Sequence, residues 1–85
     1  MPTRNVRVSV GDLVFSREDG PSVGAVRGVS AHELLIDIEG LGDVAVPADQ
    51  IAAVHEGKVV LAFDRLDPEI QAAVVVANDQ EHSYR

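Results

Sequence analysis

Short runs in which apolar and polar residues alternate recur along most of the chain. Val6 to Val10 alternates strictly and Leu34 to Glu39 alternates over most of its length, which predicts half-buried strands with one face toward a core. Other apolar runs are shorter and are bounded by glycine, proline or polar residues, which is typical of strands that end in turns. These runs predict further strands at 13–15, 23–26, 44–46, 52–55 and 58–62.

Glycine and proline mark the connections between these strands. Asp19-Gly20 and Glu56-Gly57 each lie between two predicted strands, so each is expected to form the turn of a β-hairpin. Gly24 lies inside a strand, where glycine is typical of a bulge or a bend. Pro47 lacks an amide hydrogen and is expected to end its strand, with one 3₁₀ turn after it.

The periodicity changes to that of a helix after residue 64. Asp67-Pro68-Glu69 supplies an N-cap, a proline at the first helical position and an acid in the first turn. Asn78 is the predicted end of the helix. Val74-Val75-Val76 also favours a strand, so both a helix and a strand remain open for residues 66–77. The residues that share one helical face are Ile70, Ala73, Val74 and Ala77.

These elements predict a mainly β fold, a small antiparallel β-barrel of about six short strands with one C-terminal helix. We divide the 85 residues into a tail (1–5), a barrel domain (6–63), a helix packed on the barrel or on a partner (64–78) and a flexible tail (79–85). Aromatic residues make up only 4%, so the core must consist of aliphatic side chains. The predicted core is Val8, Leu13, Phe15, Val26, Leu34, Ile36, Ile38, Val46, Val59 and Leu61.

The charge balance narrows the range of partners. The chain carries 14 acidic and 7 basic residues, a net charge of −7, and such a surface repels phosphate backbones. Nucleic acid is therefore not expected to be the primary ligand. The chain has no cysteine, no apolar run long enough for a transmembrane segment, and no apolar signal peptide at Met1–Asn5. The expected location is the cytoplasm.

Residue types that carry chemistry are present without the spacing that catalysis or metal binding needs. His32, His55 and His82 do not have the i, i+4 spacing of a helical zinc site. The acids at 18–19 and 64–69 do not follow the pattern of a calcium-binding loop, and no serine lies in a Gly-x-Ser-x-Gly motif. We expect no cofactor, no metal and no catalytic residue, and hence a protein that is not an enzyme.

The order of short motifs resembles that of the PRC-barrel domain family, and the resemblance covers roughly Val8 to Ala62. It implies a small β-barrel that acts as an adaptor for other proteins, with stand-alone copies that pair as homodimers and no fixed catalytic residues. Gly24 corresponds to the strand glycine of the family, and Pro47 to the proline before the last hairpin. The motifs are Gly11-x-x-Val14-x-Ser16, Asp19-Gly20, Val23-Gly24-x-Val26, Val46-Pro47 with Ile51 four residues after the proline, and Gly57-x-Val59-x-Leu61.

Two functions remain open. The first is a non-enzymatic adaptor that binds another protein or itself, with Ile70, Val74, Val75 and Val76 as its candidate interaction residues. A helix that is apolar at all four positions has more apolar surface than one side of a small barrel covers. The alternative is a regulatory module that binds a small ligand or a divalent ion through the acidic loops or the mouth of the barrel.

Overall fold

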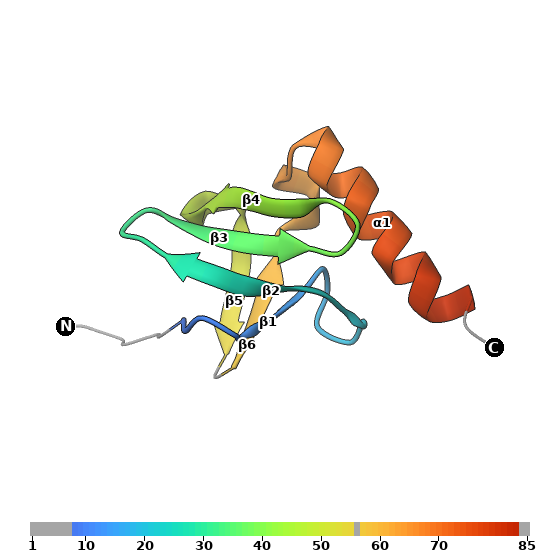
Figure 1. Ribbon diagram of the computed structural model, residues 1–85, viewed down its shortest axis with the longest axis horizontal. Coiled ribbons are helices and arrows are strands. Elements are labelled where there is room, and N and C mark those ends of the chain that lie inside the picture. The colour runs from blue at the N-terminus through green and yellow to red at the C-terminus, as the bar shows by residue number, and fades with distance from the viewer. Residues whose placement is uncertain (1–7, 56, 84–85) are drawn as a thin grey trace.

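The computed structural model describes residues 8–55 and 57–83, with side chains through Asn78 (Figure 1). The strands in these ranges are β1 (Leu13–Phe15), β2 (Ser22–Val29), β3 (Glu33–Ile38), β4 (Gly42–Pro47), β5 (Ile51–His55) and β6 (Lys58–Leu61). Two 3₁₀ turns, η1 (Ala48–Gln50) and η2 (Phe63–Arg65), precede β5 and the helix, and the helix α1 spans Pro68–Ser83.

The strands form one sheet in the order β4-β3-β2-β1-β6-β5, which curves into a half-barrel (Figure 1). Both predicted hairpins, β1–β2 and β5–β6, are antiparallel, as are β2–β3 and β3–β4. β1 and β6 pair in parallel, so the sheet is mixed, whereas the sequence predicted an antiparallel one. The mainly β fold with one C-terminal helix is confirmed.

Strand β3 follows its sequence pattern closely. Leu34, Ile36 and Ile38 are buried, as their alternation predicted, while Leu35 is exposed on the opposite face. Strand β1 does not follow the prediction: Val14 is fully buried, Leu13 is 47% exposed and Phe15 is only half-buried. All three β1 residues are apolar, so no polar residue marks the outward face and the predicted register was shifted by one residue.

A single aliphatic core fills the concave side of the sheet. The predicted core residues Val26, Val46, Val59 and Leu61 are buried in it, and Val8 packs against it half-buried. The core also includes Val14, Val23 and Leu66, which the sequence did not assign to it, and Ile70, Val74 and Ala77 from the predicted inner face of the helix.

Gly24 and Pro47 have clear structural roles. A Cβ atom built on Gly24 would lie 2.2 Å from the carbonyl oxygen of Asp37, so only glycine lets β2 approach β3 this closely. Pro47 ends β4, which is an edge strand, and there a missing amide donor costs no ladder hydrogen bond. The predicted 3₁₀ turn follows directly as η1.

The ends of the chain differ from the sequence-based boundaries. Val8 to Val10 lie outside any strand, and the earlier part of the strand predicted at Val6–Val10, like the tail 1–5, falls outside the described residues. The amide of Asp12 donates to the carbonyl of Ser9, in a turn with Gly11 at φ 100°.

The segment 66–77, for which both a helix and a strand were open, is helical from Pro68 onward. α1 continues to Ser83, five residues beyond its predicted end at Asn78 and into the segment expected to be a flexible tail. Asn78 therefore lies inside the helix and does not end it. Its amide nitrogen instead donates to the Ser16 hydroxyl at 3.0 Å.

Candidate interaction surfaces

Helix α1 covers one end of the half-barrel with its inner face. Its first turn is fixed by the carbonyl of Asp67, which accepts hydrogen bonds from the amides of Ile70 and Gln71. Ile70, Val74 and Ala77 are buried against the sheet. Two of the four predicted interaction residues, Ile70 and Val74, therefore belong to the core of this chain and are not available to a partner.

The outer face of α1 carries the other two predicted interaction residues. Val75 is 45% exposed and Val76 is 52% exposed. Val76 borders a hollow of about 250 Å³ that Ala72 and Ala73 share with Glu39 and Gly40 of the β3–β4 turn. We call this surface, Val75 and Val76 with that hollow, the helix face.

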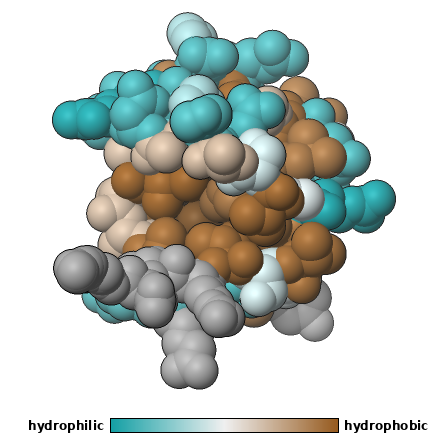
Figure 2. All heavy atoms as spheres, turned by 90° about the vertical axis from the view of Figure 1, so that its left-hand side faces the viewer, coloured by the Kyte–Doolittle hydropathy of each residue, from teal (hydrophilic) through white to brown (hydrophobic). Residues whose placement is uncertain are grey.

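Among the described residues, no helix covers the end of the half-barrel away from α1. Figure 2 looks onto this end and shows a broad apolar area there. A hollow of about 320 Å³ opens into it between the tip of the β2–β3 hairpin and η1. Its apolar lining consists of Val8, Val29, Ala31, Leu34, Ala48 and Ile51.

The apolar area continues around the tip of the β2–β3 hairpin. A second hollow, of about 270 Å³, is lined by Val29 and Leu35 together with Gly28, Ser30 and Glu33. Val29 is 52% exposed and Leu35 is 39% exposed. Gly28 pairs with Leu35 across the strands and leaves that side chain uncovered. We call the two hollows with Val29 and Leu35 the open end.

The polar residues of the open end do not form a catalytic arrangement. Ser30, His32 and Glu33 all line the larger hollow, and these residue types occur in nucleophilic triads. The Ser30 hydroxyl, however, donates to the backbone carbonyl of Glu33 at 3.0 Å, a bond that closes the hairpin turn. Within residues 8–55 and 57–78, His32 makes no side-chain hydrogen bond to Ser30 or Glu33, so these three side chains do not form a hydrogen-bonded triad.

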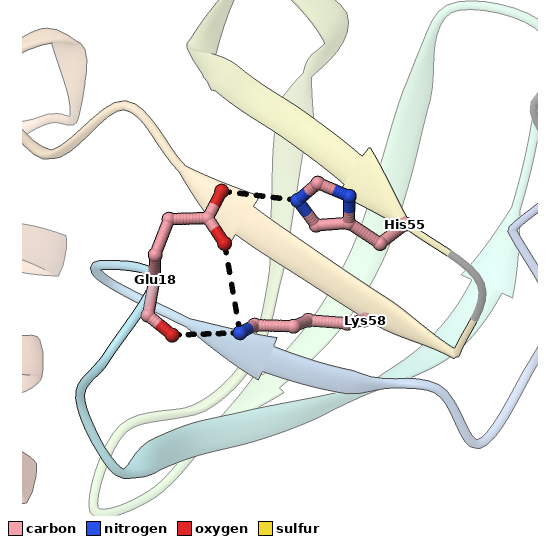
Figure 3. Close-up of polar contacts among 3 residues, drawn as sticks. All are labelled: Glu18, His55 and Lys58. Atoms are coloured by element: carbon pink, nitrogen blue, oxygen red, sulfur yellow. Dashed lines mark hydrogen bonds and ion pairs between the residues drawn. The ribbon is translucent and has the colours of Figure 1, made fainter.

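A polar cluster joins the β1–β2 loop to the β5–β6 hairpin (Figure 3). The Glu18 carboxylate lies 3.0 Å from Nε2 of His55 and 3.6 Å from Nζ of Lys58. The Lys58 ammonium also donates to the backbone carbonyl of Glu18 at 2.6 Å and lies 4.8 Å from the centre of the Phe15 ring. The hydrogen bond with His55, followed by the positive charges of His55 and Lys58, lowers the pKa of Glu18 below its usual 4.5.

These contacts connect the β1–β2 loop to the β5–β6 hairpin. His55 and Lys58 oppose each other in the β5–β6 register, so one carboxylate can reach both side chains. Glu18 and His55 are both more than half exposed, and such exposed pairs contribute little to stability. Across the described part of the chain, no three histidine or acidic side chains lie close enough together to hold a metal ion.

Most of the carboxylates that the structure describes form no ion pair. Among the side chains that the structure describes, Glu18 is the only acid that forms an ion pair. Asp37 and Asp43 lie directly opposite each other on β3 and β4, a cross-strand arrangement of like charges that is unfavourable by itself. Asp37 and Glu39 also line a shallow hollow of about 280 Å³ on the outer side of the sheet, next to the helix face.

Comparison of the chain with family models, with curated proteins and with solved structures gives no match. Within the described ranges, no helix combines the length and the apolar character that a membrane crossing would require.

The sequence identified part of these surfaces. Val75 and Val76 were predicted to be exposed because they point away from the face that holds Val74, and both are exposed. The open end was not predicted, since it is formed by strand ends that are far apart in sequence. The contact between Glu18 and His55 was also missed, because 37 residues separate them.

Proposed function

We propose that this protein is a non-enzymatic protein-interaction domain, similar in kind to PRC-barrel adaptors, and that it associates with itself. The observation that carries the proposal is the amount of apolar side chain left uncovered on so small a domain. The large hydrophobic residues that are exposed among those described are Val10, Leu13, Val29, Leu35, Phe63, Val75 and Val76.

Exposed apolar side chains favour binding because a partner can remove them from water. Single exposed valines are ordinary, but apolar residues that gather around hollows mark contact surfaces. Val29 and Leu35 gather in this way at the open end, and Val76 does so at the helix face. Covering such side chains stabilises a complex by about 25 cal/mol per Å² of apolar surface removed from water.

The resemblance to PRC-barrel domains agrees with this reading. The motifs that carry it include Gly24 and Pro47, and both have roles expected of a small curved sheet: close strand approach and the end of an edge strand. A location in the cytoplasm and a protein rather than a nucleic acid as ligand are part of the same proposal. The net charge of −7 favours a protein as the ligand, because it repels nucleic acid.

The alternative function, binding of a small ligand or a divalent ion, receives no comparable support. The Glu18 carboxylate of the first acidic loop is already engaged by His55 and Lys58. The acids near the start of α1 lie on exposed positions of a helix terminus, where they have the ordinary role of complementing the helix dipole.

The proposal is tested by the mass of the protein in solution. Light scattering behind size-exclusion chromatography, at loading concentrations from low to high micromolar, should show a mass approaching twice the 9.0 kDa of the chain as concentration rises. A mass of one chain at every concentration would contradict self-association.

A further inference from the structure

We infer that two copies of this chain pair through the open end of the half-barrel, with the two β2–β3 hairpin tips facing each other around a two-fold axis. This inference rests on the proposed function, and it specifies the partner as a second copy and the surface as the open end. It also assigns self-association to a surface other than the helix face that the sequence indicated.

The shape and the apolar lining of the open end suit a second copy. Its hollow of about 320 Å³ is lined by aliphatic side chains from β2, β3, η1, β5 and the segment before β1. Leu34 at its floor is only 5% exposed, while Val29 at its rim is 52% exposed. An apolar side chain of a second copy could therefore bury itself against Leu34 and cover Val29 at the same time, as the central contacts of protein interfaces do.

Charge complementarity also suits a second copy. Arg27 lies on β2 and Glu33 on β3, so the same hairpin presents one charge of each sign. Both side chains are exposed, and neither forms an ion pair with another side chain that the structure describes. Around a two-fold axis, Arg27 of one copy can meet Glu33 of the other, and the same pair is made a second time. The β2–β3 hairpin, which borders the open end, can therefore pair its charges with those of a second copy.

The helix face does not share this property. Glu39 lines its hollow, and Glu69 lies on the same side of α1 as Val76 because seven residues are about two helical turns. A symmetric contact would bring the glutamates of one copy toward those of the other, and like charges in contact oppose association. Among the described residues that line the hollow there is no lysine or arginine. A second copy is thus better accommodated at the open end.

Two matched double variants separate the surfaces. Val29→Asp/Leu35→Asp changes the open end, and Val75→Asp/Val76→Asp changes the helix face. Each pair replaces two exposed aliphatic residues by two acids, so net charge and the number of substitutions are the same. The open-end variant should raise the dimer dissociation constant by roughly a hundredfold or more, because two carboxylates would be buried without partners. The helix-face variant should leave it within about threefold of wild type.

A charge exchange tests the two-fold arrangement without altering the apolar residues. Arg27→Glu and Glu33→Arg should each raise the dissociation constant by roughly tenfold, since each creates two like-charge contacts. The combined variant restores the opposite charges and should return to within about threefold of wild type. Circular dichroism and thermal melting of every variant confirm that the fold is retained.

Each outcome has a distinct meaning. A wild-type protein that is monomeric at high micromolar concentration would contradict the proposed self-association itself. A dimer that is lost in Val75→Asp/Val76→Asp and kept in Val29→Asp/Leu35→Asp would overturn the inference about the open end and leave self-association in place. Failure of the combined charge exchange to restore association, when both single changes weaken it, would contradict the two-fold contact between Arg27 and Glu33.

Discussion

The two ends of the half-barrel use the same kinds of side chain and differ in what covers them. At the helix end, Ile70 and Val74 pack onto the sheet and are almost completely buried. At the open end, Val29 and Ile51 line a hollow instead, and Val29 remains half exposed. Aliphatic composition alone therefore does not distinguish core from surface in this chain. The position of a single helix decides which end becomes core.

The ends also differ in charge. Glu39 and Glu69 flank the helix face, and Asp37 with Asp43 adds a pair of like charges on the neighbouring strands. The hairpin tip at the open end has one base, Arg27, for one acid, Glu33. A surface that is apolar and balanced in charge is suited to a second copy of itself, whereas an apolar surface among carboxylates is suited to a basic partner.

The largest expected effect is on stability, from substitutions of aliphatic residues at the two ends. Ile70→Ala should lower the free energy of unfolding by about 2–5 kcal/mol, because the side chain is buried between α1 and the sheet and its removal leaves a cavity. Val29→Ala should change it by less than about 0.5 kcal/mol, as is usual for exposed positions. Urea denaturation gives both values.

The urea melts need low protein concentration, where dimerisation does not add to the stability of the chain. Equal costs for Ile70→Ala and Val29→Ala under these conditions would show that the two ends are not covered differently. Raising the protein concentration should then stabilise wild type more than Val29→Ala.

The smallest expected effect is the change in stability with pH that Glu18 of the β1–β2 loop produces. This loop contacts α1 through Ser16, and it contacts the β5–β6 hairpin through Glu18. The pKa of Glu18 is lower in the folded chain than its usual 4.5, so its contribution to stability is present above that pH. The contribution is lost as the pH falls through the lowered value. Glu18→Gln removes the carboxylate, so the difference in stability from wild type should shrink between about pH 5.5 and pH 3.

Thermal melts of wild type and Glu18→Gln across this pH range give the comparison, with Asp19→Gln as the matched control on the neighbouring residue. A stability difference that stays constant as the pH falls would show that the carboxylate charge is not what holds the loop to the hairpin.

The sequence predicted those parts of the fold in which apolar and polar residues alternate within a single strand. The six residues of β3 include polar side chains, so their alternation placed Leu34, Ile36 and Ile38 in the core. The three apolar residues of β1 carry no such mark, and Leu13 and Phe15 were assigned to the core in place of Val14. The parallel pairing of β1 with β6 was also not predicted, because turn signals identify only strands that follow each other in the chain.

The candidate site was less accessible to sequence reasoning than the fold. Helical geometry was sufficient to place Val75 and Val76 on the outer face of α1. The open end brings Val8, Val29 and Ile51 together from separate elements, and no local pattern marks strand ends that a helix leaves uncovered. Nor does the sequence show which carboxylates remain unpaired, since this depends on distances across the sheet.

The central claim is that the open end, and not the helix face, meets a second copy. The most direct test is a series of ¹H–¹⁵N correlation spectra of the wild-type protein, recorded from dilute to concentrated solution. We expect the amide signals of Val29, Glu33 and Leu35 to shift with concentration while those of Val75 and Val76 stay in place. Shifts confined to Val75 and Val76, or no shift in either group, would contradict this account.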